Sequence, residues 1–455
     1  MAEAVILNPY APYARMLIRR LWVNHGIRTV CLHTDWRKRI TLEGRYPLLR
    51  SSAVAAHYML ESANWDSIAA QLSQRHEIVG VLPYEEGMVV PMSDLASALD
   101  LSWAQPEILA DFRDKRALKQ RVANADPSIR LNLFRDVANP QHVLETVREH
   151  HLQRFVLKPN SGSGNHHVRF FDAYTSRQSL AEYFEDASDQ VLLEEFIDGP
   201  EFWVNGQMDV HGEPTVVGVG MYYRIPSNGI TNLEVGTTSL QPTDPRFDAL
   251  RKYAENVMRA TGLHRSPFHL EAIVDDRGPC LVEVAARLCG ELGTLLDMEH
   301  HGPQLDLIDI AAHYYVSDAE LPVIPLDWHR VASRWVATAT GDSAYDQRLV
   351  AASGVEAIEA SENFLFWIKR PEPGDYVQRT VSLTTRPWSV ALTGSLDQDP
   401  WRVVEAARSS VGLHGGVSDS LTILQKWPMC KGVLSKAWSS RPRLYETQAL
   451  WHSLS

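Results

Sequence analysis

Two acidic residues on facing strands place the strongest constraint on this chain. Residues 268–290, FHLEAIVDDRGPCLVEVAARLCG, read as two apolar strands joined by turn-forming residues. A hairpin centred near Arg277 places Glu271 opposite Glu283, and cross-strand neighbours on one face lie about 5 Å apart at Cβ. Two carboxylates at that distance repel each other, so a folded chain needs a compensating charge beside them. Mg²⁺ would supply it, and a surface hairpin with solvated charges is the alternative.

The same hairpin also presents a cation to these acids. Because side chains alternate along a strand, Ala285 and Arg287 share the face of Glu283. An arginine beside two metal-binding carboxylates can hold a phosphate group or a developing oxyanion. Arg287 is therefore a candidate catalytic residue.

The charge balance and the cysteines narrow the class of protein. The chain has 455 residues with 44 basic and 56 acidic side chains, a net charge of −12, which argues against a nucleic-acid partner. The four cysteines form no CxxC pair, so neither a zinc motif nor a disulfide framework is indicated. No apolar run approaches the length of a membrane span. We expect a reduced, cytoplasmic protein without a membrane partner, large enough for more than one domain.

Strands alternate with helices at the N-terminus. Apolar strands are predicted at residues 4–7, 28–33 and 79–83, with a helix at about 13–24 that ends at Gly26. This alternation predicts a parallel α/β sheet. No GxGxxG follows the first strand, so a dinucleotide fingerprint is not indicated there.

A lysine precedes a loop of small residues in the middle of the chain. The predicted strand Phe155–Lys158 runs into PNSGSGN at residues 159–165. The backbone N–H groups of such a loop can wrap phosphate oxygens, with Lys158 as a nearby positive charge. The order differs from the Walker pattern, and a plain hairpin turn remains the alternative.

A further pair of glutamates brackets a bend. Glu194 lies on a predicted strand at residues 191–197, the turn Asp198-Gly199-Pro200 follows, and Glu201 begins the next strand. These two side chains could bind the amine and the ribose hydroxyls of a nucleotide. From about Leu321 the pattern changes to short strands, and beyond residue 416 it weakens into a tail to which the sequence assigns no role.

Taken in order, these segments resemble the ATP-grasp superfamily. The resemblance rests on DFRDKRALKQRV, FVLKPNSGSG, VLLEEFIDGPEFWV and EVAARLCG. It implies an α/β (α+β) fold with a Rossmann-like pre-ATP-grasp domain and a β-rich C-terminal subdomain. The implied division is 1–108, the N-terminal domain; 109–206, the small subdomain with the phosphate loop; 207–415, the large domain with the metal site and a β-rich lid; and 416–455, a tail.

The resemblance also assigns roles to individual residues. Arg287 and Lys158 would be catalytic, and Glu271 and Glu283 would bind one or two Mg²⁺ ions. The nucleotide-binding positions would be Lys115, Lys158, Ser161, Gly162, Ser163, Gly164, Glu194, Glu195, Ile197 and Glu201. Many members of the superfamily have Asn where this chain has Ala285, and that Asn is a further metal ligand. This chain therefore lacks one expected ligand of the second metal ion.

Within the superfamily the chain is most similar to the L-amino-acid ligases of the bacilysin-synthetase type. This implies an ATP-dependent ligase that joins a small carboxylate to an amine through an acyl phosphate, in specialised metabolism. The carboxylate, the amine and the general base are not identified by the sequence, and a homodimer is the default assembly. The alternatives are an ATP-dependent carboxylase of the biotin-carboxylase kind and a non-catalytic nucleotide-binding regulator.

Overall fold

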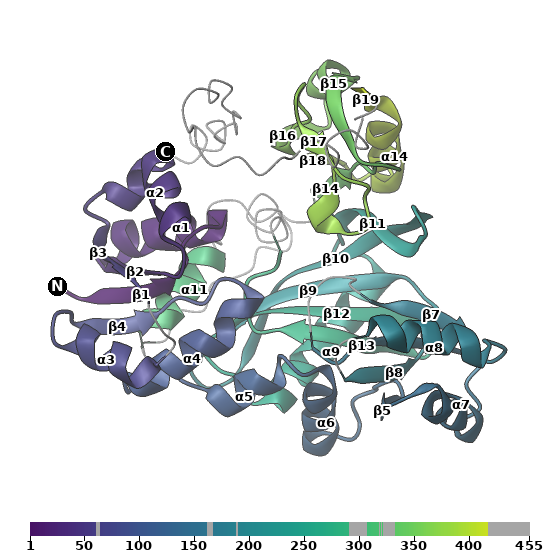
Figure 1. Cartoon of the computed structure of the whole chain (residues 1–455), viewed down its shortest axis with the longest axis horizontal. Coiled ribbons are helices and arrows are strands. Elements are labelled where there is room, and N and C mark those ends of the chain that lie inside the picture. The colour runs from purple at the N-terminus through teal and green to yellow at the C-terminus, as the bar shows by residue number, and fades with distance from the viewer. Residues whose placement is uncertain are drawn as a thin grey trace, which may run out of the picture. The chain divides into compact units, whose positions relative to one another are not determined.

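The computed structural model describes residues 1–60, 64–161, 167–187, 190–290, 307–317, 319, 321 and 333–416 (Figure 1). Two compact units are present. The first comprises residues 1–222 and 237–335, and the second residues 223–236 and 336–455. The strands β10 (Pro214–Ser227) and β11 (Ile230–Ser239) carry the chain from the first unit into the second and back. The four-part division expected from the sequence stays a prediction.

The first unit begins with a four-stranded parallel sheet. Its strand order is β3 (Val54–Met59), β2 (Arg28–His33), β1 (Glu3–Leu7) and β4 (Ile78–Val81). The connecting helices are α1 (Pro12–Arg20), α2 (Trp36–Arg45), α3 (Trp65–Ser73) and α4 (Val89–Ala98). All five residues of β1 are buried, as an apolar strand between two neighbours requires. The parallel sheet predicted from the sequence is confirmed.

The turn after α1 shows why the first helix stops where the sequence predicts. A turn of π-helix at Leu21–His25 extends α1, and Gly26 ends it with a φ of +66°. Glycine adopts this left-handed conformation without the penalty that a Cβ brings. The chain then turns directly into β2. Short 3-10 turns follow later at Pro47–Arg50 and Glu86–Met88.

A second sheet in this unit is antiparallel. Its order is β5 (Phe134–Val137), β8 (Val191–Glu195), β6 (Arg154–Pro159) and β7 (Arg169–Asp172). The helices α7 (Pro140–Glu149) and α8 (Arg177–Asp186) pack on it through a separate hydrophobic core, which includes Val143, Phe155, Leu180 and Tyr183. Polar side chains such as Lys158 can therefore lie on the face of the sheet that these helices do not cover.

The third sheet of the first unit holds the acidic hairpin. The part of this sheet that carries the hairpin has the strand order β13 (Gly278–Ala285), β12 (Pro267–Asp275), β9 (Glu201–Met208) and β10. The helices α5 (Pro106–Asp111), α6 (Lys115–Ala125), α9 (Pro245–Thr261) and α11 (Leu307–Val316) complete the unit. Buried residues of this sheet and of α9 belong to the same hydrophobic core as the N-terminal sheet. The two sheets and their helices therefore form one packed body that fixes the hairpin.

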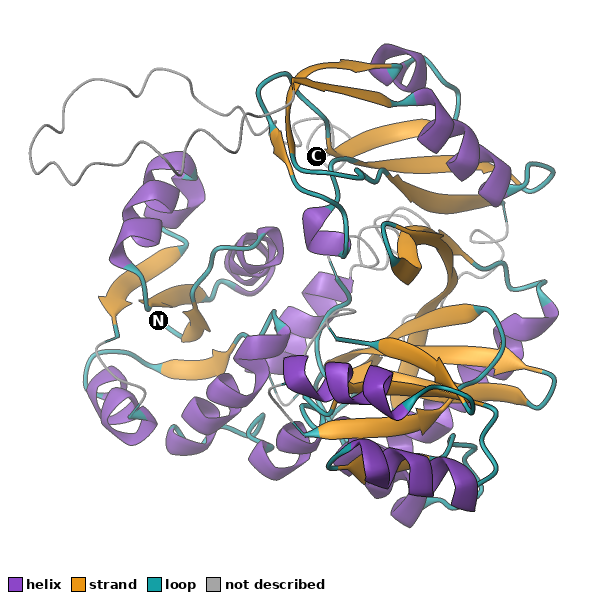
Figure 2. Cartoon of the chain, turned by 45° about the vertical axis from the view of Figure 1, so that its right-hand side comes forward, coloured by secondary structure: helices purple, strands orange, loops and turns teal. Residues whose placement is uncertain are grey.

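The second unit is rich in short strands, as the sequence predicts (Figure 2). Its strands are β11, β14 (Arg334–Thr340), β15 (Gln347–Ser353), β16 (Phe364–Lys369), β17 (Tyr376–Val377), β18 (Ser389–Ser395) and β19 (Gly412–Gly416). The helices are α13 (Val355–Glu359) and α14 (Pro400–Ser410), with a 3-10 turn at Leu383–Thr385. In the described part of the chain, no helix is both long and apolar enough to cross a membrane. Residues 417–455 of the predicted tail lie outside the described residues.

Candidate active site

The acidic hairpin forms with the register that the sequence predicts. Glu271 on β12 pairs with Glu283 on β13, and His269 pairs with Ala285. The turn itself is shorter than expected, because Asp275 already pairs with Gly278. An uninterrupted ladder from that turn would set Glu271 against Val282. A β-bulge between Glu271 and Ala272 shifts the register by one residue and brings the two carboxylates face to face.

Hydrogen bonds hold Glu271 in place from the neighbouring strands. The Tyr222 hydroxyl on β10 donates to Glu271 Oε1 at 2.9 Å. His269 Nε2 lies 3.2 Å from the Tyr222 hydroxyl and 3.4 Å from Glu271 Oε1. The other ring nitrogen of His269 lies 2.7 Å from Oδ1 of Asn205, which is fully buried. Three adjacent strands therefore orient one carboxylate.

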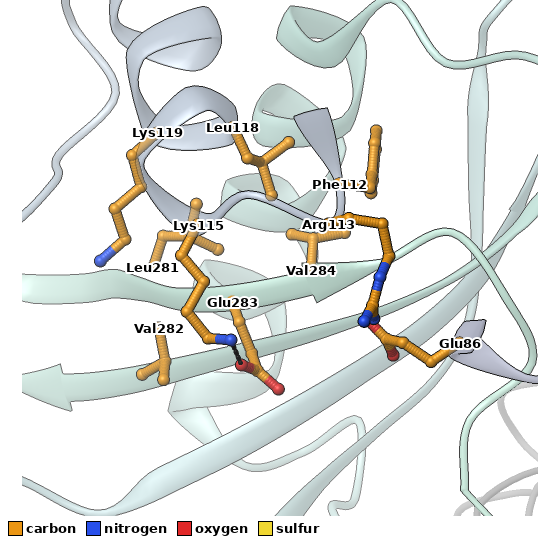
Figure 3. Close-up of a pocket in the computed structure, with 10 residues that line it drawn as sticks. All are labelled: Glu86, Phe112, Arg113, Lys115, Leu118, Lys119, Leu281, Val282, Glu283 and Val284. Carbon is orange, nitrogen blue, oxygen red and sulfur yellow. Dashed lines mark ion pairs between the residues drawn. The ribbon is translucent and has the colours of Figure 1, made fainter. Parts of the chain in front are cut away.

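Lys115 lies over the other carboxylate. It is the first residue of α6, and its Nζ lies 3.4 Å from Glu283 Oε2 (Figure 3). The side chain of Asp114 caps this helix by accepting from the N–H of Ala117, and it also accepts from Asn160 Nδ2 at 2.7 Å. Asn160 O in turn accepts from the Lys115 N–H at 3.1 Å. Asn160, which directly precedes the predicted phosphate-binding positions, therefore fixes the start of the lysine helix.

Arg287 is held by a glutamate that sequence reasoning missed. Arg287 Nε donates to Glu86 Oε2 at 2.8 Å, and its Nη2 lies 2.7 Å from the same oxygen. Glu86 Oε1 lies 2.6 Å from Arg113 Nη1. Burial alone would lower the pKa of Arg287, but the charge of Glu86 raises it. The only sequence signal for Glu86 was its place in a loop after a predicted strand.

These side chains line a small hollow between α6 and β13. Glu86, Arg113, Lys115, Lys119 and Glu283 are its charged members. In Figure 3, Lys115 reaches from the helix toward Glu283, while the ammonium group of Lys119 points away from it. The hollow measures about 10 Å³, which is room for about one water molecule and far less than a nucleotide needs. The acids and cations are therefore in place without a fully formed pocket around them.

A buried ion cluster lies next to this hollow. Glu194 Oε1 accepts from Lys119 Nζ at 2.6 Å, and Glu194 Oε2 lies 2.9 Å from Lys158 Nζ. Asn132 accepts from Lys119 at 2.7 Å and donates to Glu194 at 3.1 Å. All four residues are at least nine-tenths buried. Burial alone would raise the pKa of Glu194, but the two ammonium groups lower it to about 2, whereas burial lowers the pKa of Lys119.

The cluster changes the predicted role of one residue and adds another. The sequence placed Glu194 against the adenine amine, yet both of its oxygens bind protein groups here. Lys119 was missed, although it follows Lys115 by four residues and so lies on the same face of α6. The nucleotide role of Glu194 stays a prediction.

The remaining predicted nucleotide positions fall on the phosphate loop and on residues 195–201, which join β8 to β9 and are called the hinge below. The Glu195 N–H donates to Leu133 O, and Glu195 O accepts from Asn132. Ile197 is buried and makes no backbone hydrogen bond within the described residues, so its N–H and C=O can meet a ligand. Glu201 opens β9, and Ser161 is exposed at the start of the loop. The predicted phosphate-loop residues Gly162, Ser163 and Gly164 lie outside the described residues.

Comparisons with known proteins agree with this architecture. Residues 153–295, which carry the hinge, the third sheet and the acidic hairpin, match the ATP-grasp domain family. The L-amino acid ligase from Bacillus licheniformis superimposes with a TM-score of 0.70 at 15% identity, covering 91% of this chain and 98% of the other. The chain has the ATP-grasp fold.

Two further proteins are similar to this chain, one in sequence and one in fold. Dapdiamide A synthase from Enterobacter agglomerans is 26% identical over 242 residues, 51% of this chain and 56% of the relative. A biotin carboxylase from Campylobacter jejuni superimposes with a TM-score of 0.62 at 13% identity, covering 90% of this chain and 92% of the other. The chain spans about half the length of the curated relatives it matches.

Proposed function

We propose that this protein is an ATP-dependent carboxylate–amine ligase that forms an amide bond through an acyl phosphate. The observation that carries the proposal is the pairing of Glu271 with Glu283, within one packed unit that also holds Lys115, Lys158 and Arg287. Similarity to dapdiamide A synthase and to an L-amino acid ligase supports amide formation over other ATP-grasp chemistry.

The two carboxylates fit a magnesium site. They offer only oxygen donors, and both reach solvent, with side-chain exposures of 17% for Glu271 and 36% for Glu283. Mg²⁺ prefers such ligands and keeps several of its waters. When bound, the ion would screen the phosphate charge of ATP and draw electron density from the transferred phosphoryl group. Lys115, which contacts Glu283, would stand beside those phosphates.

Phosphoryl transfer to the substrate carboxylate would yield ADP and an acyl phosphate. The protein's task in such a step is positioning and charge stabilisation, which suits Lys115 and Lys158. The amine nitrogen would then attack the acyl carbon, and inorganic phosphate would leave. Among the described residues, the contacts of Arg287 use three of its five N–H groups, which leaves two for a phosphate or a tetrahedral oxyanion.

The hinge would hold the adenine and the ribose. The N–H and C=O of Ile197 would meet the ring, and Glu201 at the start of β9 would accept from ribose hydroxyls. Glu194 would contribute indirectly, because it holds Lys158 in place through an ion pair of 2.9 Å. Small carboxylate and amine substrates, a homodimer and a cytoplasmic location remain part of the proposal.

The deciding experiment is ADP release from Mg²⁺-ATP across a panel of amino acids and other carboxylates, singly and in pairs. We expect one pair to give ADP, phosphate and a condensed product in equal amounts. Arg287→Ala and Glu283→Gln should abolish turnover, while Arg259→Ala, on the exposed side of α9, should match the unchanged protein. Turnover that depends on bicarbonate would instead support a carboxylase. Tight nucleotide binding without ADP release for any pair would support a regulator.

A further inference from the structure

Three potential metal ligands converge in the N-terminal sheet, in a part of the chain that the ligase proposal does not use. His33 ends β2, His57 lies on the adjacent strand β3, and Glu43 lies on α2 above them. One ligand atom from each lies within 4.8 Å of the other two. In the parallel register His57 pairs with Cys31, so His33 and His57 are diagonal neighbours on one face of the sheet.

The spacing of the donor atoms suits a small transition-metal ion. His33 Nε2 and His57 Nδ1 are 2.9 Å apart, and His57 Nδ1 lies 3.4 Å from Glu43 Oε1. With metal–ligand bonds of about 2.0–2.1 Å in a tetrahedron, neighbouring donors are roughly 3.3 Å apart. The two observed distances bracket that value. The third pair of donor atoms, those of His33 and Glu43, lies within 4.8 Å.

The hydrogen bonds around His57 expose the nitrogen that a metal requires. His57 Nε2 lies 2.8 Å from Leu49 O, which can only accept, so Nε2 carries the proton. In the neutral ring, Nδ1 then presents a lone pair. That lone pair lies 2.9 Å from His33 Nε2 and 3.4 Å from Glu43 Oε1, the two other proposed ligand atoms. Metal-binding histidines commonly donate their other ring N–H to a backbone carbonyl, which fixes the orientation of the ring.

The Tyr10 hydroxyl is a partner for His33 Nδ1, and it allows His33 Nε2 to be the unprotonated nitrogen of the ring. Its Nδ1 lies 3.5 Å from the Tyr10 hydroxyl, whose own proton is donated to Asp35 O at 3.2 Å. In the metal-free protein His33 Nε2–H donates to His57 Nδ1 at 2.9 Å, and when a metal binds the proton can move to Nδ1, where the Tyr10 oxygen accepts it and Nε2 becomes a lone pair. The ring of His33 is buried, with 1% of the residue exposed, so it cannot exchange this partner for bulk water.

One cation competes for the carboxylate. Arg39 Nε donates to Glu43 Oε1 at 2.6 Å, one turn earlier on α2. Arg39 partly neutralises Glu43 and weakens its attraction for an ion. A ligating carboxylate is commonly hydrogen-bonded by a neighbour, and it offers about four lone-pair sites on two oxygens. Arg39 can therefore remain as a support, or release one oxygen, while Glu43 binds.

We propose that His33, His57 and Glu43 form a binding site for a divalent transition-metal ion of the Zn²⁺ type. Two imidazoles and one carboxylate are a ligand set that zinc accepts, with a further position left for water. The ion would tie α2 to strands β2 and β3. It would replace the 2.9 Å hydrogen bond between His33 and His57 with two metal–nitrogen bonds.

The test is Zn²⁺ binding by the full chain after chelation and dialysis, measured by calorimetry and by competition with a chromophoric chelator. We expect one equivalent that survives in Glu283→Gln, which separates this site from the paired acids of the hairpin. His57→Gln and Glu43→Gln should each weaken binding at least about tenfold. The matched controls are His142→Gln and Glu77→Gln, which change exposed residues outside the cluster.

The proposal would be overturned by an unchanged protein without a saturable Zn²⁺ equivalent, or by cluster variants that bind as the controls do. If a cluster variant fails to fold, X-ray absorption of Zn²⁺ on the unchanged protein decides. Two imidazole nitrogens and oxygen ligands support the site, whereas sulfur ligation or an all-oxygen shell overturns it. The remaining explanation would then be a hydrogen-bonded pair, His33 with His57.

Discussion

Replacing Glu194 with glutamine is expected to destabilise the sheet that carries Lys158. The change keeps the shape of the side chain and removes its charge, leaving the ammonium groups of Lys119 and Lys158 buried together. The residues at these two lysines are only 1% and 5% exposed, so water cannot replace the lost anion. Breaking a buried ion pair by removing one partner costs about 3–5 kcal/mol. The two ammonium groups also lower the pKa of Glu194, which shows that they stabilise its charged form.

Amide hydrogen exchange on β6 and β8 is the appropriate assay, because a chain of two compact units need not unfold in one step. We expect the opening free energy of these amides to fall by about 3–5 kcal/mol in Glu194→Gln. Adding Lys119→Met should restore part of it, with a coupling of about 1 kcal/mol or more, because one uncompensated charge is removed. The control Glu182→Gln changes an exposed residue of α8 and should stay within about 0.5 kcal/mol. Equal protection in Glu194→Gln and the control would refute the reasoning.

Three further outcomes follow from the same geometry. The folded pKa of Glu194 lies below the ordinary value of about 4.3. The stability that ionised Glu194 gives to the folded protein is therefore complete above that pH and is lost as the pH falls toward 2. An acid titration of the opening free energy should show this loss. In Gly220→Ala the new methyl group would overlap the Trp203 ring, so hydrogen exchange should show the opening free energy of the β9 and β10 amides reduced by roughly 1–3 kcal/mol or more. In Tyr222→Phe the loss of the 2.9 Å hydrogen bond frees Glu271 to rotate, so the Mg²⁺ concentration that gives half-maximal ADP release should rise several-fold.

Each of these outcomes has a result that contradicts it. A pH profile in Glu194→Gln with the same acid-sensitive slope would assign that slope to another group. Gly44→Ala is the matched control for the glycine, because nothing lies within 4 Å of its added Cβ, and equal stability of both variants would argue against the overlap. For Tyr222→Phe, an unchanged Mg²⁺ dependence would show that the hydroxyl does not orient Glu271.

Local patterns alone were sufficient for much of the fold and for part of the site. The alternation of apolar segments predicted the parallel N-terminal sheet, and Gly26 marked the helix end with the left-handed conformation that glycine favours. Residues 28–33 form a strand over the predicted range. The pairing of Glu271 with Glu283 was predicted from their spacing about a turn, because neighbours on an antiparallel hairpin are set by local geometry.

In the same hairpin the predicted pairing is correct, but the predicted turn is not. The turn closes one residue earlier than expected, at Asp275 and Gly278, and only the bulge restores the facing acids. A bulge depends on how β13 fits its neighbours, and no residue type in the hairpin marks it. The sequence therefore determined which residues pair, while the sheet decided how the register is reached.

Contacts between distant segments were decided by the tertiary structure alone. Glu86 meets Arg287 across 201 positions of the chain, and Lys119 meets Glu194 across 75. Residue type and spacing along one strand or helix carry no information about which buried cation will need which carboxylate. That pairing is decided in the folded protein, because a buried charge loses its water and is stable only beside an opposite charge. The sequence thus determined the elements and the local acid pair, and packing decided which charges complete the site.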